Sequence, residues 1–329
     1  MPNKRFSIFY FLLSITASTQ AQLVFKDVTI IPMNSERTLV HQDVLIENGR
    51  IKSIQPNSKK TFGQATIVAA SGKFLMPGLA DMHVHLPRNE QYGYGLDQFM
   101  QLHLAAGVTT VRSMRGDEND PKLQRAIKEG KKHWPDLVIS APAFSARYWI
   151  RSDSLARLVH RYKMNGFQLL KLLSIPSVAW FDTLTMIAQR EHIKLAGHAP
   201  AGIPLVQAFK QGLSCVEHLG GYETLPIEGP TFSETLGQTV ANKVYNCPTL
   251  DWYFVNYTQI PLDSLNQRKG LDRLPTALVQ NWSKTLENYQ TKQNQKHPDS
   301  LQQELIADKR YIAHKLEVLK QLYQLSVSY

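Results

Sequence analysis

Two histidines, two positions apart, are the first residues of this sequence whose types and spacing could do chemistry. His83 and His85 end the run Pro77-Gly78-Leu79-Ala80-Asp81-Met82-His83-Val84-His85, which is typical of a buried strand. Residues two apart on a strand point to the same face, so the two imidazoles would project together. Two convergent imidazoles form half of a site for a divalent transition metal. Two packed structural histidines are the alternative, because a His-x-His pair also arises by chance.

Two later histidines could complete such a site. His198 follows Lys194-Leu195-Ala196-Gly197, and His218 follows Cys215-Val216-Glu217, so each comes directly after a strand candidate. Either one alone would more commonly be a structural or capping residue. Together, one strand–helix unit apart and downstream of His83 and His85, they are predicted to be metal ligands.

Lys171 is the charged residue of an otherwise apolar strand candidate, Gln168-Leu169-Leu170-Lys171-Leu172-Leu173. Burying an unpaired ammonium is costly, so the sequence leaves three alternatives. The pKa of the amine could be lowered, or a nearby carboxylate could pair with it. Carbon dioxide could also convert the amine to an anionic carbamate that bridges two metals.

Four further residues have side chains that could serve the same site. Tyr148 and Arg151 lie in the loop after the third strand candidate and are predicted to contact substrate, because such loops carry function in barrels. His103 and His192 lie in helical segments and are interpreted as surface residues.

Residues so far apart in sequence need a fold that brings strand ends together. From Pro77 onward, apolar strand candidates alternate with helical segments, a pattern typical of a parallel sheet. Seven such units favour a (β/α)8 TIM-like barrel over residues 77–329, with its active site at the carboxyl ends of the strands. The strand candidates are 79–84, 109–113, 137–141, 169–173, 194–196, 215–217 and 244–248.

The segments on either side of these units have other patterns. Residues 22–76 contain short strands and an Asn48-Gly49 hairpin signal, and we expect a small β-sandwich domain. After Thr249 the sequence favours long polar helices over about 274–289 and 300–325. We interpret the final residues, 326–329, as the first residues of an eighth strand that is missing or incomplete.

The amino terminus predicts export. Residues 1–21 combine a basic start, a short apolar run and small residues before Gln22, which is typical of a cleaved signal peptide. The mature protein would then be periplasmic or extracellular and would not bind a membrane. Cys215 and Cys247 could pair, but we interpret them as two buried, unreactive thiols.

Composition narrows the class of protein. Hydrophobic residues make up 43% of the 329 residues, enough for a sizeable core and against disorder. The formal net charge is +10, but the basic residues are scattered. We therefore interpret the charge as a solvated surface and expect no nucleic-acid partner. The sequence leaves the oligomeric state open.

His83-x-His85, Lys171, His198 and His218, in that order, resemble the metal ligands of the amidohydrolase superfamily, in the branch of imidazolonepropionase-like proteins and exported Xaa-Pro dipeptidases. The resemblance implies two Zn²⁺ ions, one on His83 and His85 and one on His198 and His218. Carboxylated Lys171 and a hydroxide would bridge them, with Lys171 and His218 also acting in catalysis. It further implies hydrolysis of a carbon–nitrogen bond in a cyclic amide or dipeptide.

The same resemblance implies an aspartate at the end of the eighth strand, which the sequence does not supply. Among the aspartates after the seventh strand candidate, Asp263, Asp272, Asp299 and Asp308 follow no apolar strand, and Asp251 lies one strand too early. A catalytically impaired fragment of such an enzyme is therefore the alternative expectation.

Overall fold

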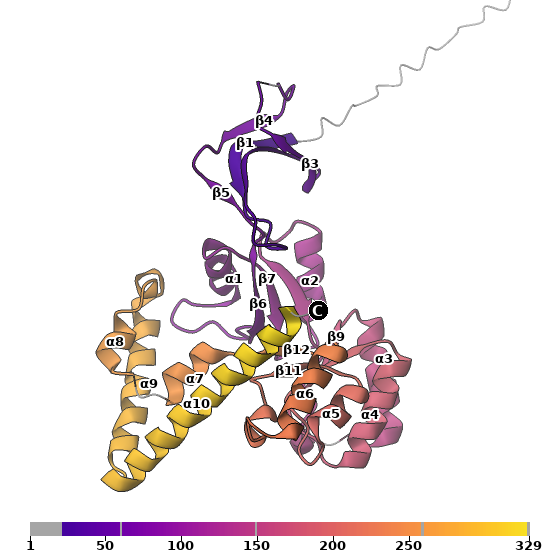
Figure 1. Cartoon of the computed structure of the whole chain (residues 1–329), viewed down its shortest axis with the longest axis vertical. Coiled ribbons are helices and arrows are strands. Elements are labelled where there is room, and N and C mark those ends of the chain that lie inside the picture. The colour runs from indigo at the N-terminus through magenta and orange to yellow at the C-terminus, as the bar shows by residue number, and fades with distance from the viewer. Residues whose placement is uncertain (1–21, 60, 149, 258–259, 328–329) are drawn as a thin grey trace, which may run out of the picture. The chain divides into compact units, whose positions relative to one another are not determined.

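The computed structural model describes residues 22–59, 61–148, 150–257 and 260–327 (Figure 1). The chain divides into two compact units between Pro77 and Gly78, and each is described by itself. The signal-peptide prediction falls on residues 1–21, outside the described residues.

The first unit is built on one five-stranded sheet. Its strands are β1 (Gln22–Ile30), β2 (Leu39–Glu47), β3 (Arg50–Pro56), β4 (Thr66–Ala69) and β5 (Phe74–Leu75). The order is β3-β2-β1-β4, with β5 also pairing with β1. The β2–β3 hairpin turns at Asn48 and Gly49, whose φ angles of 52° and 71° match the turn in which both central residues are left-handed. The predicted two-sheet sandwich is not confirmed, because the described part of this unit contains a single sheet.

The second unit alternates strands and helices as the sequence predicts. Its strands are β6 (Leu79–Val84), β7 (Val108–Ser113), β8 (Asp136–Ile139), β9 (Leu169–Leu172), β10 (Lys194–Gly197), β11 (Leu213–Glu217) and β12 (Tyr245–Cys247). All pairs within β6-β7-β8 and within β9-β10-β11-β12 are parallel. Parallel bridges from Ser140 to Leu169 and from Phe144 to Leu172 join the two sets, so the strands follow one another in chain order.

Helices separate the strands of this unit and extend beyond them. They are α1 (Leu96–Ala105), α2 (Asp120–Lys128), α3 (Ser152–Met164), α4 (Val178–Arg190), α5 (Leu205–Lys210), α6 (Pro230–Ala241), α7 (Leu250–Tyr257), α8 (Leu262–Asn266), α9 (Thr276–Asn294) and α10 (Pro298–Val327), with short 3₁₀ turns η1 (Ala146–Tyr148), η2 (Tyr222–Thr224) and η3 (Leu271–Arg273). Among the described helices, none is both long enough and apolar enough to cross a membrane.

Strand β9 shows how the sheet separates a helix-facing side from an inner side. Leu170 and Leu172 belong to the large core that packs against the helices, whereas Leu169 belongs to a small apolar cluster with Ala196 and Cys215 of the neighbouring strands. Because side chains alternate along a strand, Lys171 shares the inner face with Leu169. The inner face therefore carries an apolar layer at one end and polar side chains toward the carboxyl ends of the strands.

The strand series is parallel but not a closed barrel. No pairing joins β12 to β6 in the part of the chain that the structure describes. The expectation of strand residues at 326–329 is wrong for Ser326 and Val327, which end α10, while 328–329 lie outside the described residues. The buried positions Ile312, Lys315, Val318 and Leu322 recur at helical spacing, so packing of one helix face continues nearly to the end of α10.

Candidate metal centre

The four predicted histidines and Lys171 line one cavity of about 780 Å³ at the carboxyl ends of the strands. The ring centroid of His83 lies 5.4 Å from that of His85 and 4.6 Å from that of His218. The rings of His198 and His218 are 5.1 Å apart. The remaining lining residues are Asp81, Leu173, Cys247, Thr249, Leu250, Asp251, Trp252 and Tyr253.

Each of these five residues lies in a strand or directly after one. His83 lies in β6, Lys171 lies in β9, and His198 and His218 directly follow β10 and β11. Gly197, just before His198, has a φ of 150°, and a Cβ at this position would lie 2.0 Å from the carbonyl oxygen of Leu172. Glycine therefore allows β10 to approach β9 closely enough for the His198 amide to donate to Leu172, at 2.9 Å.

His83 is oriented by a buried carboxylate. Nδ1 of His83 lies 2.6 Å from Oε2 of Glu217, and the other Glu217 oxygen accepts from Nη2 of Arg112 at 2.7 Å. Burial by itself would raise the pKa of Glu217, but the hydrogen bond to His83 and the charge of Arg112 outweigh it and lower that pKa. An ionised Glu217 accepts a hydrogen bond from Nδ1–H of His83 and leaves Nε2 to face a ligand, as in carboxylate–histidine–metal arrangements.

His218 is held in an uncommon backbone conformation. His218 and Leu219 have φ angles of 63° and 53°, in the left-handed region that residues with a Cβ rarely adopt. The His218 amide donates to the carbonyl of Cys247 at 2.7 Å, and Nδ1 of His218 lies 2.7 Å from Oγ1 of Thr249. Leu219 is fully buried, so packing on one side and hydrogen bonds on the other hold this turn.

Lys171 is 1% exposed, and its Nζ has no hydrogen-bond partner among the described residues. Burial lowers the pKa of Lys171 to about 8, and the negative charge of Glu217 only partly opposes this effect. A buried amine without a hydrogen-bond partner destabilises a fold, so such amines are rare unless a ligand contacts them. The unpartnered amine of Lys171 is therefore free to contact a bound group such as a metal.

Burial lowers the pKa of three of the histidines around Lys171. Burial, together with neighbouring positive charges, lowers the pKa of His198 to about 4 and that of His218 to about 3, and burial lowers the pKa of His85 as well. Neutral imidazoles are the form that binds metal. Four imidazoles and an unpartnered lysine form a donor set that fits divalent metal. His83 and His85 would hold one ion and His198 and His218 another.

A second grouping shares His83. Potential ligand atoms of His83, Glu217 and Cys247 lie within 4.8 Å of one another. Both carboxylate oxygens of Glu217 already accept hydrogen bonds, and burial raises the pKa of the Cys247 thiol to about 12. We therefore interpret Glu217 as the group that orients His83. Cys215 and Cys247 are both free thiols, Cys215 buried and Cys247 half-buried.

The residues predicted to contact substrate are placed differently. Tyr148 ends η1, but its side chain lies outside the described part. Arg151 is exposed and forms an ion pair with Asp153 at 3.4 Å, and it is not among the described residues that line the cavity. Asp251 does line the cavity, and its carboxylate accepts two hydrogen bonds of 3.0 Å from Arg268.

Several residues of the site are not predicted from the sequence. Arg112 and Glu217 are buried charges in apolar strands, the same signal that singled out Lys171. His103 is partly buried rather than on the surface, with Nε2 3.6 Å from Oδ2 of Asp81, whereas His192 is exposed as expected. No signal pointed to Trp252 and Tyr253, which form part of the cavity wall.

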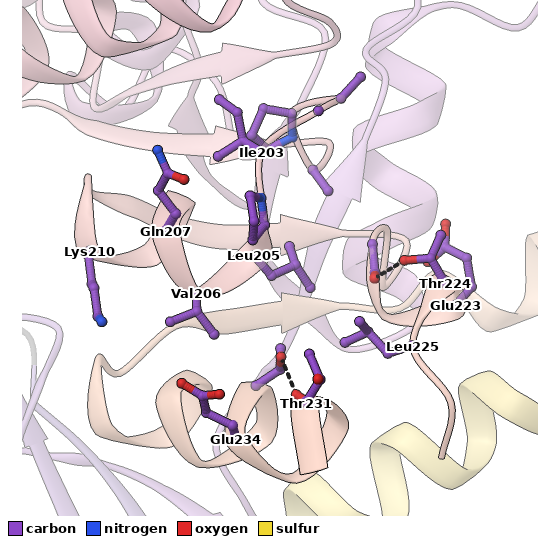
Figure 2. Close-up of a pocket in the computed structure, with 17 residues that line it drawn as sticks. Ile203, Leu205, Val206, Gln207, Lys210, Glu223, Thr224, Leu225, Thr231 and Glu234 are labelled. Atoms are coloured by element: carbon purple, nitrogen blue, oxygen red, sulfur yellow. Dashed lines mark hydrogen bonds between the residues drawn. The ribbon is translucent and has the colours of Figure 1, made fainter. Parts of the chain in front are cut away.

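A separate cavity of about 660 Å³ lies between the segment 199–207, η2 and α6 (Figure 2). Lys210, Glu223 and Glu234 are among its lining residues, and Thr224 donates to the carbonyl of Gly221. None of the predicted metal ligands is among the described residues that line this cavity.

Comparison with known proteins gives no matching family model. Individual curated proteins do match. The chain is 32% identical over 108 residues to a dihydroorotase of Bacillus cytotoxicus, covering 32% of this chain and 23% of that protein. It is 37% identical over 101 residues to an adenine deaminase of a Chelativorans species, covering 30% of this chain and 16% of the relative. The matches thus span less than a quarter of these relatives' length.

Solved structures match over most of the chain. A Xaa-Pro dipeptidase with bound methionine superposes with a TM-score of 0.59 at 16% identity, over 76% of this chain and 70% of that one. The ochratoxinase of A. niger superposes with a TM-score of 0.60 at 13% identity, over 93% of this chain and 74% of that one. At these identities the likeness concerns the fold, which is that of amidohydrolase TIM-barrel structures. Together with the named relatives, these findings support a relationship to the amidohydrolase superfamily.

Proposed function

We propose that the protein is a metal-dependent hydrolase of carbon–nitrogen bonds whose substrate is a cyclic amide or a dipeptide. The observation that carries the proposal is Lys171, a buried amine with no hydrogen-bond partner among the described residues, which lines one cavity with four histidines. The similarity to amidohydrolase-type proteins supports the reaction class. We propose two Zn²⁺ ions and a carboxylated Lys171 as the loaded state.

The residues of the chain divide the work of such a site. A divalent metal, when bound, supplies Lewis acidity toward a carbonyl oxygen and a lowered pKa for water. Glu217 accepts a hydrogen bond from Nδ1 of His83, and Oγ1 of Thr249 contacts Nδ1 of His218, so both rings are fixed in direction. The side chains of Leu173, Leu250 and Trp252 provide an apolar wall beside the histidines, suited to the uncharged part of an amide substrate.

Metal content and hydrolysis test this proposal together. The purified chain is loaded with Zn²⁺, its bound metal is quantified, and it is assayed on cyclic amides and on dipeptides. We expect retained zinc and turnover of at least one class, with both lost when His85 and His198 are replaced by alanine. A wild-type chain that retains no zinc and cleaves neither class would contradict the proposal.

The bridging role of Lys171 has its own readout. ¹³C-labelled bicarbonate added with Zn²⁺ is expected to give a carbamate carbonyl resonance in the wild-type protein. Lys171→Met should lack that resonance, and Lys210→Met, the same substitution on the exposed end of α5, should retain it. A resonance that persists in Lys171→Met would assign the carbamate to another lysine.

We also propose that the protein is exported and cleaved after Ala21, from the signal-like residues 1–21. Expression with its native amino terminus in a bacterial host should yield a periplasmic protein that begins at Gln22. A mature protein that still begins at Met1 and stays in the cytoplasmic fraction would refute this part.

A further inference from the structure

The second unit buries another lysine beside the candidate metal centre, and this one is fully engaged. Lys315 of α10 is 1% exposed, and its Nζ donates to the backbone carbonyl oxygen of His218 at 2.5 Å. Nearly a hundred residues separate the two in sequence. The contact therefore connects the long carboxyl-terminal helix directly to a predicted metal ligand.

Two tyrosine rings enclose the ammonium group of Lys315. Nζ lies 4.5 Å from the ring centroid of Tyr253 and 4.4 Å from that of Tyr311, distances typical of cation–π contacts. The Tyr253 ring also lies 6.5 Å from the ring of His218 and lines the histidine cavity. Lys315 is thus held in place by an aromatic side chain that itself forms part of the site.

Lys315 projects from a helix that packs against elements close to His218 in sequence. α10 contacts η2, α6 and α7. The ammonium of Lys315 donates to the carbonyl oxygen of His218, and the negative charge of Glu223, in η2, also acts on it.

The His218 carbonyl is a place where such a donor matters. His218 and Leu219 both have positive φ angles, so this peptide segment is strained relative to an ordinary strand end. The amide of His218 is fixed by Cys247, but its carbonyl faces α10 rather than a neighbouring strand. Without Lys315, the turn that aims the His218 imidazole would lose the hydrogen bond on its carbonyl side.

We propose that Lys315 is a positioning residue for the metal centre, which clamps the strained His218–Leu219 turn and so fixes the direction of the His218 imidazole. The proposal rests on the proposed function, because it takes His218 to be a metal ligand. It assigns α10 a role in the site that its distance in sequence does not suggest. Its alternative is a purely structural contact that fastens α10 to the rest of the unit.

Zn²⁺ affinity separates these two roles. Lys315→Met keeps the apolar stem and removes the ammonium, and we expect it to weaken Zn²⁺ binding by about 10- to 100-fold in competition with a chelator, the usual cost of losing a group that orients a ligand. Val318→Ala is the control, because Val318 is fully buried on the same helix face and contacts the apolar core. It should loosen α10 while leaving Zn²⁺ affinity within about twofold.

A second readout follows the geometry of the ligand. Co²⁺ alone is used as a spectroscopic probe, and its visible absorption should change in Lys315→Met but not in Val318→Ala. If Lys315→Met cannot be obtained folded, Tyr311→Leu removes one of the two rings over the ammonium and should weaken Zn²⁺ binding by about two- to fivefold.

The outcomes are distinct. If the wild type binds Zn²⁺ and Lys315→Met binds it with the same affinity, the positioning role is overturned and the proposed function still stands. Equal weakening in Lys315→Met and Val318→Ala would also overturn it, because loosening of α10 would then be sufficient. A wild-type chain that binds no Zn²⁺ would instead refute the proposed function on which the inference rests.

Discussion

The two units of this protein each bury a charged residue in a sheet, and they treat it in opposite ways. Asp43, on β2 of the first unit, is fully buried and accepts hydrogen bonds from the amides of Asp27 and Ser58, at 3.0 and 3.4 Å. It also accepts from Nδ2 of Asn57 at 2.8 Å and from Nζ of Lys26 at 3.4 Å. The chain itself satisfies this carboxylate completely.

Lys171, on β9 of the second unit, has the same degree of burial and no hydrogen-bond partner in the described part of the chain. The nearby charges that act on it, Glu217 and Arg112, are already bonded to each other. A charge that the fold satisfies stabilises the fold, whereas one left unsatisfied costs stability and must be explained by what binds there. The difference predicts which substitutions affect folding and which affect function.

The largest effect is expected at Lys171. Lys171→Met should lower kcat/KM by at least about 10²-fold, because a bridging ligand is lost, and should leave the metal-free protein as stable as the wild type or more stable. Hydrolysis rates and thermal unfolding of the metal-free protein measure the two effects, with Lys210→Met as control. A marked loss of metal-free stability would place Lys171 in the same structural class as Asp43.

Glu217 shares features with both Asp43 and Lys171. Its carboxylate is satisfied by the chain, as that of Asp43 is, and it also orients a candidate metal ligand. Glu217→Gln should weaken Zn²⁺ binding by about 10- to 100-fold, because it removes the charge that fixes the tautomer of His83. Glu191→Gln is a matched control, because Glu191 accepts from Nδ1 of the exposed His160 at 2.9 Å, away from the cavity. Equal Zn²⁺ affinities for the two variants would show that the Glu217–His83 contact is structural.

The same contrast explains how far the sequence could be read. Apolar runs and the histidines in or after them are local signals, so the sequence predicts the strands of the second unit and places four candidate ligands at their ends. Lys171 is recognisable as a charge in an apolar strand. Arg112 and Glu217 carry that same signal, but their partnership joins β7 to β11, a contact between distant segments that spacing does not reveal. Sequence shows that a charge is buried, but only the structure shows whether it is paired.

Other expectations depend on long-range packing, which the sequence does not reveal. The sequence predicts that residues 326–329 begin an eighth strand, yet Ser326 and Val327 end α10, whose buried positions recur at helical spacing as far as Leu322. The sandwich expected for residues 22–76 needs a second sheet, and short strand patterns do not say with which sheet they pair. Lys315 lies in a helix that the sequence predicts to be polar, and its contact with His218 is seen only in the structure.

In the first unit, Asp43→Asn should affect folding alone. Replacing the carboxylate weakens several charge-assisted hydrogen bonds in a buried site, and we expect a loss of about 2 to 4 kcal/mol in the free energy of local opening. Hydrogen exchange of the β1 and β2 amides measures that opening, with Glu47→Gln, a partly buried carboxylate whose ion-pair partner Lys52 is exposed, as control. Zn²⁺ binding should be unchanged, and a loss of Zn²⁺ affinity would break the separation between the two units.

Acid provides the mildest version of the same test. Burial by itself would raise the pKa of Asp43, but hydrogen bonds from Asp27, Asn57 and Ser58 outweigh it, and the net pKa is lowered from 3.8. The stabilisation is therefore fully present above the unfolded-state pKa and is lost as pH falls through the lower folded-state pKa. Hydrogen-exchange protection of β1 and β2 should fall below about pH 4 in the wild type, and by less in Asp43→Asn, which has no carboxyl group to titrate. Identical acid profiles for the two proteins would mean that Asp43 does not hold this sheet by its charge, and that other carboxylates control its acid sensitivity.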